Sequence, residues 1–111
     1  MSERYIVKIT AQAQTQMREI INYISYTLQA PVTARKILGL LERAITSLEQ
    51  LPARMPLIEE EPWRSQGIRK LVVKNYLIYF YVTEATRTVQ VLAVIYSARD
   101  QRHQLSKMDV E

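Results

Sequence analysis

The chain has 111 residues, which is enough for one domain with a hydrophobic core and too short for two. It contains no cysteine, so disulfides and thiolate metal sites are excluded, and this composition fits a reducing cytoplasm. No apolar run approaches the roughly 18 residues that span a bilayer, and the first residues alternate charged with apolar side chains, unlike a signal peptide. We therefore expect a single cytoplasmic domain over residues 1–111, with no cofactor and no membrane contact.

The positive charge of the chain is concentrated in its C-terminal half. The net charge is +4, yet residues 64–107 hold eight lysine and arginine residues against two acidic ones, a local charge of +6. A positive electrostatic potential of this kind favours an anionic partner, either a nucleic acid or an acidic protein segment. The same charge can also serve solubility alone.

The N-terminal half of the sequence predicts one strand followed by two helices. Residues 4–10 are rich in β-branched side chains and predict a short strand. From Ala13 apolar residues recur at helical spacing, and Thr10 suits the N-cap of this first helix. Pro31 suits the first turn of a second helix. Because the two helices are joined so tightly, we expect them to lie antiparallel.

The C-terminal half predicts a long connection and then three strands. Residues 51–67 contain three prolines and a glycine, which indicates an irregular connection over the surface. Three strands are predicted after it, near residues 68–73, 76–83 and 88–97. Together these elements predict an α+β domain.

The middle strand of these three is rich in aromatic residues, in the stretch "NYLIYFYV". Alternation along the strand predicts that one set of side chains faces the helices: Tyr76, Ile78, Phe80 and Val82. Most of this set lacks polar atoms that would need partners in a core. The expected contacts of Tyr76 and Phe80 are with Ile21, Ile24, Leu38 and Leu41.

Tyr79 and Tyr81 then belong to the opposite, more open face of the sheet. We expect them to line a groove that is flanked by basic side chains and that anchors or stacks on a partner. Tyrosine is also simply a common strand residue, so a structural role is the alternative.

The order of elements, together with "LPARMP", "EPWRSQGIRKLVVKNYLIYFYV" and the closing "VLAVIYSARD", resembles the RelE/ParE superfamily of bacterial toxins from type II toxin–antitoxin systems. The resemblance covers nearly the whole chain, with residues 98–111 as a C-terminal tail. It implies a β-α-α-β-β-β fold in which a helical hairpin packs on one face of a mostly antiparallel four-stranded sheet. It also implies a hetero-oligomer with a cognate antitoxin, encoded by a neighbouring gene, whose acidic segment would meet the basic half of this chain.

The superfamily contains two kinds of toxin. RelE-like members are ribosome-dependent mRNA endonucleases, and ParE-like members poison DNA gyrase. RelE-like nucleases place an arginine at the position of Leu77 and a tyrosine at the position of Leu105, whereas their second arginine matches Arg99. The resemblance therefore favours growth inhibition by ParE-like targeting of gyrase. Two alternatives stay open: a RelE-like nuclease acting on mRNA at the ribosome, and an inactive binding module that retains the fold.

A nuclease site could still be assembled from other residues, because RNA cleavage needs a base, an acid and cations that stabilise the charged phosphorus. The catalytic candidates are Arg69, Arg99 and His103, with Arg102 as a further phosphate ligand. Histidine can act as an acid or a base near neutral pH, although a lone histidine in a polar terminal segment is also commonly solvated and idle. The acidic run at residues 59–61 is typical of a solvated surface and would repel RNA. No part of the sequence has the spacing of a metal site.

A toxin that acts by binding would use basic and aromatic side chains instead. The residues expected to contact the target or the antitoxin are Arg69, Lys70, Lys74, Tyr79, Tyr81, Arg99 and Arg102.

Overall fold

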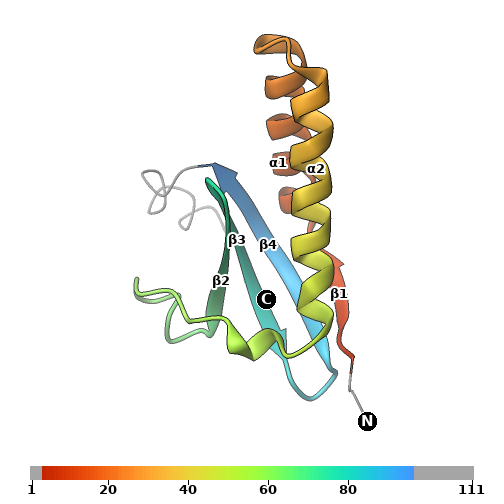
Figure 1. Ribbon diagram of the computed structural model, residues 1–111. Coiled ribbons are helices and arrows are strands. Elements are labelled where there is room, and N and C mark those ends of the chain that lie inside the picture. Colours follow the sequence, from red (N-terminus) through yellow and green to blue (C-terminus); the bar gives the residue numbers. More distant parts are fainter. Residues whose placement is uncertain (1–3, 97–111) are drawn as a thin grey trace.

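An antiparallel helical hairpin covers one face of a four-stranded sheet, so the protein has two layers (Figure 1). The structure, a computed structural model, describes residues 4–96. Its main elements are β1 (Ile6–Ile9), α1 (Ala11–Asn22), α2 (Pro31–Thr46), β2 (Ile68–Val73), β3 (Tyr76–Thr83) and β4 (Thr88–Tyr96). The predicted order of one strand, two helices and three strands is confirmed.

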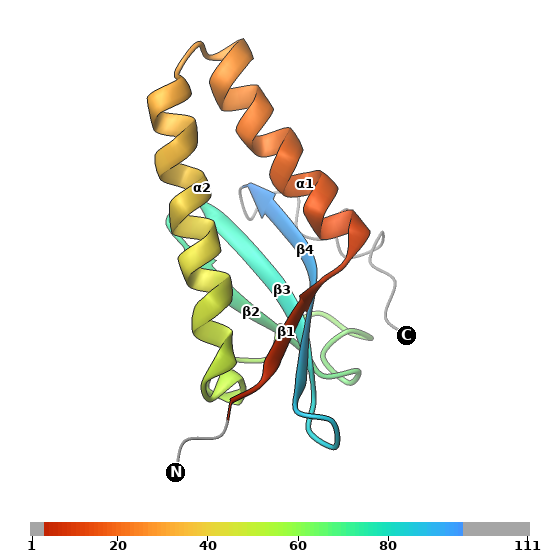
Figure 2. The ribbon, with the colours of Figure 1, turned by 90° about the vertical axis from the view of Figure 1, so that its right-hand side faces the viewer.

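The first and last strands of the chain are neighbours in the sheet. The strand order is β1-β4-β3-β2, with β1 parallel to β4 and the other pairs antiparallel. The predicted mostly antiparallel sheet is confirmed, and its pairing is mixed. A parallel pair needs a long crossover, which the helices and two strands between β1 and β4 supply. Figure 2 shows β1 beside β4 and the far end of the hairpin projecting beyond the sheet.

The helices begin where the sequence predicts. Thr10 caps α1, since its side-chain oxygen accepts a hydrogen bond from the Ala13 amide at 3.1 Å. α1 then widens into a π-helical turn, Tyr23–Thr27. Gln29 follows with a left-handed φ of 52°, and Pro31 opens α2 at its first turn. The predicted tight connection between antiparallel helices is confirmed.

The main hydrophobic core lies between the hairpin and the sheet. Its buried members are Ala13, Leu41, Ile45, Leu48, Tyr76, Ile78, Phe80, Val89, Val91 and Val94. Tyr76, Ile78 and Phe80 all come from one face of β3, and Val82 packs against the same core, so the predicted assignment of this face is confirmed. Alternation along a strand was sufficient here because the helices bury a whole face of β3.

The helix side of this core differs in part from the prediction. Leu41 is fully buried in it, as expected. Ile21 and Leu38 are only half-buried and line a separate hollow on the hairpin, so the prediction is wrong for these two residues. α1 packs Met17 and Ile20 against the core instead. These residues follow the buried Ala13 at helical spacing, so all three lie on one side of the helix.

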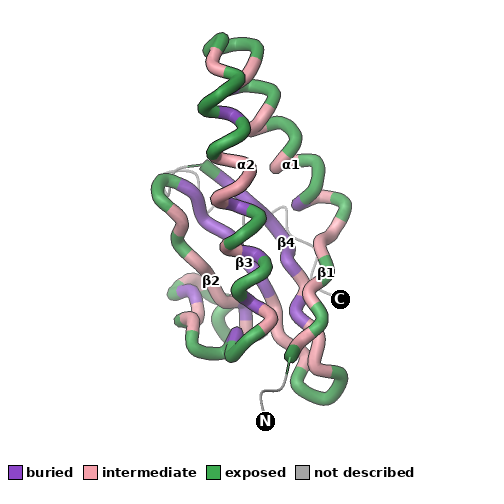
Figure 3. Tube along the Cα trace, turned by 45° about the vertical axis from the view of Figure 1, so that its right-hand side comes forward, coloured by how far each residue is buried: buried purple, intermediate pink, exposed green. Residues whose placement is uncertain are grey.

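A second hydrophobic core lies on the other face of the sheet, beneath the connection that leads from α2 to β2. This connection, residues 51–67, is irregular as predicted apart from a short 3-10 helix, Pro52–Arg54. It runs back along β2, where Leu57 forms an antiparallel bridge with Arg69. The buried members of the second core are Ile58, Ile68, Leu77, Tyr79, Leu92, Ala93 and Ile95. Figure 3 shows the resulting buried stretches in β3 and β4.

A β-bulge in β4 changes which side chains of that strand face each core. Tyr79 pairs with Ala93, but the next residue, Phe80, pairs with Val91, which leaves Leu92 as the extra residue. The extra residue shifts the alternation of side chains along the strand. Leu92 and Ala93 consequently both join the second core, and Val91 stays in the main core.

Candidate functional site

Arg69 and Lys70 are both among the residues expected to contact a partner, and the structure places them on opposite faces of β2. Arg69 pairs with Phe80 and Lys70 pairs with Tyr79, which belong to the two different faces of β3. The Arg69 guanidinium donates a hydrogen bond of 2.6 Å to the carbonyl oxygen of Met55. Arg69 therefore fixes the connection against the sheet, and it cannot share a groove with Lys70.

The expectation that Tyr79 lines an open groove is wrong. Its side chain is 0% exposed, because the connection containing Ile58 and Trp63 packs over it. Burial raises the pKa of the Tyr79 hydroxyl well above its usual value, and the nearby Glu60 carboxylate raises it further. The hydroxyl has no hydrogen-bond partner in the described part of the chain. Tyr81 is half-buried at the edge of the same core, so it keeps part of its ring accessible.

The remaining predicted residues divide into one exposed lysine and a terminal group. Lys74 is exposed in the turn between β2 and β3, with a left-handed φ of 54°. Arg99, Arg102 and His103 lie outside the described residues, as does Leu105. The structure therefore does not test these terminal positions.

Leu77 occupies the position at which RelE-like nucleases are expected to carry an arginine. Here it is 6% exposed and belongs to the second core. A leucine can neither bind a phosphate nor transfer a proton. A charged side chain at this buried, apolar position would also lose its hydration. This position of β3 therefore has a packing role in this chain.

The far end of the helical hairpin carries an apolar surface that the sequence analysis missed. Four large side chains there are more than half exposed: Tyr23, Tyr26, Leu28 and Val32. Beside them a groove of about 430 Å³ lies between the hairpin and the end of the sheet. Its lining includes Ile20 and Ile24 of the hairpin and the rings of Tyr76 and Tyr96, which meet edge to face at 5.3 Å.

Clustered exposed apolar side chains of this kind mark interaction surfaces more often than scattered ones do. Tyr23 and Tyr26 fall outside the apolar helical spacing of the first helix, which is the sequence signal that was available. The fold brings Tyr23 and Leu28 into the same groove as Tyr96. The far end of the hairpin projects beyond the sheet (Figures 1 and 2).

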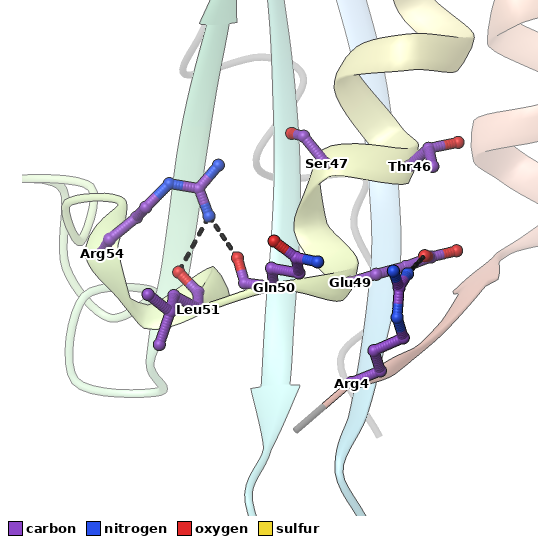
Figure 4. A pocket seen from close by; sticks show the side chains of 7 residues that line it. All are labelled: Arg4, Thr46, Ser47, Glu49, Gln50, Leu51 and Arg54. Atoms are coloured by element: carbon purple, nitrogen blue, oxygen red, sulfur yellow. Dashed lines mark hydrogen bonds and ion pairs between the residues drawn. The ribbon is translucent and has the colours of Figure 1, made fainter. Parts of the chain in front are cut away.

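A second, polar hollow of about 410 Å³ lies at the C-terminal end of α2 (Figure 4). Arg4 and Glu49 form an ion pair of 2.8 Å there. The Arg54 guanidinium donates hydrogen bonds to the carbonyl oxygens of Gln50 and, at 3.0 Å, Leu51. Both cations already have partners within the fold, so these side chains hold in place the segment that follows α2.

Residues 4–96 offer neither a metal-binding cluster nor a membrane-spanning helix. This part of the chain holds no group of three or more histidine, cysteine, aspartate or glutamate side chains arranged to bind a metal ion. None of its helices has the length and apolar character needed to cross a membrane.

Comparison with known proteins agrees with this architecture. Residues 7–101 match the family described as the ParE toxin of the type II toxin–antitoxin system parDE. A search of curated proteins found no match.

Two solved structures share the fold at low sequence identity. A chain of the chromosomal ParDE toxin–antitoxin system from P. aeruginosa superposes with a TM-score of 0.71 and 20% identity, covering 86% of this chain and 99% of that chain. A chain of the RelBE2 toxin–antitoxin complex from Mycobacterium tuberculosis superposes with a TM-score of 0.60 and 19% identity, covering 86% of this chain and 93% of that chain. Because the family match spans nearly all of the sequence, this chain belongs to the ParE toxin family of type II toxin–antitoxin systems.

Proposed function

We propose that this toxin arrests growth by binding DNA gyrase and does not hydrolyse RNA. The observation that carries the proposal is the burial of Leu77 in the second core. A nuclease of the RelE kind requires a cation at this position to stabilise the pentacoordinate phosphorus. Arg69, the one catalytic candidate within residues 4–96, is half-buried and bonded to the carbonyl of Met55. A toxin that acts by binding needs no cation at the position of Leu77 and no free guanidinium at Arg69.

The proposal can be tested in cells by inducing expression of the full chain. Gyrase poisoning should produce chromosomal DNA breaks and an SOS response while translation continues. Immediate loss of translation with intact chromosomes would instead identify a RelE-like mRNA endonuclease. Normal growth, with soluble folded protein present, would identify an inactive binding module.

The basic and histidine residues of the terminal segment provide a prediction at single-residue level. For a gyrase-directed binder, His103→Ala should leave toxicity and gyrase binding nearly unchanged, and Arg99→Ala should weaken gyrase binding in a graded, salt-dependent manner. A nuclease would respond differently, with each substitution lowering RNA cleavage by about 100-fold or more. Purified protein that cuts ribosome-bound mRNA, and loses that activity with His103→Ala, would contradict the gyrase proposal.

The same proposal includes a cognate antitoxin that docks at the far end of the hairpin. Support comes from the apolar groove between the hairpin and Tyr96, and from Lys74 in the turn next to Asn75, which lines the groove. An amphipathic, acidic antitoxin segment would match both the apolar lining and the local positive charge. The two similar solved structures come from toxin–antitoxin systems, which is consistent with such a partner.

Removing one aromatic ring from the groove should weaken the complex with the antitoxin. Tyr23 lines the groove and is 56% exposed, so Tyr23→Ala should lower affinity for the product of the neighbouring antitoxin gene by about 10- to 100-fold. Calorimetric titration measures this affinity. The matched control is Val72→Ala, because Val72 is 59% exposed on β2 and does not line the groove. Equal losses for both variants would place the antitoxin elsewhere.

A further inference from the structure

Residues 59–67, called here the cover segment, form a small self-contained unit over the second core. Within the described chain, their backbone hydrogen bonds begin and end in residues 58–68. The Arg64 amide donates to the Glu60 carbonyl at 2.9 Å, and the Gly67 amide donates to the Arg64 carbonyl at 3.0 Å. The Glu61 carboxylate accepts from both the amide and the hydroxyl of Ser65, and these hydrogen bonds lower its pKa. These hydrogen bonds are internal to the cover segment and its ends, so they do not depend on contact with β3.

Both ends of the cover segment are held firmly. Ile58 and Ile68 are each 0% exposed, and the Ile58 amide donates to the Ile68 carbonyl at 3.0 Å. These two residues bring the ends of the cover segment together at one place on β2. Gly67, at the end of the cover segment, has a φ of 87°, a backbone conformation that glycine adopts readily.

Between its ends the cover segment rests on the sheet through apolar contacts. Trp63 packs on the second core and is half-buried. A Cβ atom placed on Gly67 would lie 3.7 Å from the Tyr81 ring, so the backbone itself approaches that ring. Contacts of this kind are not directional, and they can be exchanged for equivalent contacts with another apolar surface.

The polar group beneath this apolar contact has no hydrogen-bond partner in the part of the chain that the structure describes. The Tyr79 side chain is 0% exposed, and its hydroxyl makes no hydrogen bond within residues 4–96. A buried hydroxyl without a partner raises the free energy of the state that buries it. Opening the cover segment would return the hydroxyl to water, so this one atom opposes closure.

We propose that the cover segment is a lid that opens as a unit about Ile58 and Ile68, and that the unpartnered Tyr79 hydroxyl favours the open state. Opening carries Trp63 and Glu60 away from the sheet. It uncovers the part of β3 that carries the Tyr79 ring and its phenolic hydroxyl. This inference concerns the fold of the free toxin and is independent of whether gyrase is the target.

Two measurements on the purified full chain test the lid. Trp63 is the only tryptophan in the sequence, so quenching of its fluorescence by acrylamide reports on the cover segment alone. Hydrogen exchange followed by mass spectrometry compares the amides of residues 60–67 with those of β3. A lid requires that the cover amides exchange faster than β3, through local opening.

The informative variant is Tyr79→Phe, which removes the hydroxyl and keeps the ring. We expect it to slow exchange in the cover segment by roughly tenfold and to reduce quenching of Trp63, because the closed state no longer buries an unpartnered polar atom. The matched control is Tyr81→Phe, the same chemical change on a half-buried ring, and it should leave both readouts unchanged. Unchanged or faster exchange in Tyr79→Phe would overturn the proposal. The proposal would also be overturned if the amides of the cover segment exchanged only together with those of β3, through global unfolding.

Discussion

Phe80→Ala is expected to lower the free energy of unfolding by about 3–5 kcal/mol, the range found for large-to-small substitutions at buried aromatic sites. Phe80 is 0% exposed and lies in the main core between the hairpin and the sheet. Truncation leaves a cavity that the helices on one side and the paired strands on the other cannot easily close. Urea denaturation, followed by circular dichroism, measures the change. A domain of this size has a total stability of about 5–15 kcal/mol, so much of the variant should be unfolded or insoluble when expressed.

Tyr81→Ala is the control for this prediction. Tyr81 is the next residue on β3, but it lies on the opposite face and is half-buried at the edge of the second core. Its truncation removes fewer buried contacts, so the loss of stability should be clearly smaller than for Phe80→Ala. Equal losses for the two variants would show that the main core does not hold the greater part of the packing energy.

Leu77→Arg should lower the free energy of unfolding at least as much as Phe80→Ala does. It does so although it introduces the residue type expected of a RelE-like nuclease. Leu77 is 6% exposed in an apolar cluster, and an arginine there would bury a charge without a carboxylate from the second core to pair with it. An uncompensated buried charge costs on the order of 3–5 kcal/mol. The expected result is a large drop in the urea midpoint, or insoluble protein.

Leu77→Met provides the matched control, since it conserves volume and apolar character and should cost less than about 1.5 kcal/mol. If Leu77→Arg instead remained folded with the stability of the unsubstituted toxin, the second core would have room for a cation. The burial of Leu77 would then no longer count against a nuclease site. Measuring RNA cleavage by such a folded variant would decide whether an arginine at position 77 is sufficient for nuclease activity.

The sequence by itself was enough to determine the elements, their order and the inward face of β3. Thr10 and Pro31 fix the starts of the helices through local hydrogen bonding and backbone geometry. Alternation placed Phe80 in the main core, because a strand packed against helices must bury one complete face. The family was also accessible from the sequence, since the motifs that carry the resemblance lie within the region that matches ParE toxins.

Only the tertiary structure decided which surfaces stay open. Alternation separated Tyr79 from Phe80 correctly, but it could not reveal that Ile58 and Trp63 cover Tyr79, because burial by a distant segment leaves no local pattern. The bulge at Leu92 likewise depends on the pairing of β3 with β4. For the same reason the apolar groove at the far end of the hairpin was not foreseen: its lining comes from α1, α2 and the ends of two strands, which meet only when the chain folds.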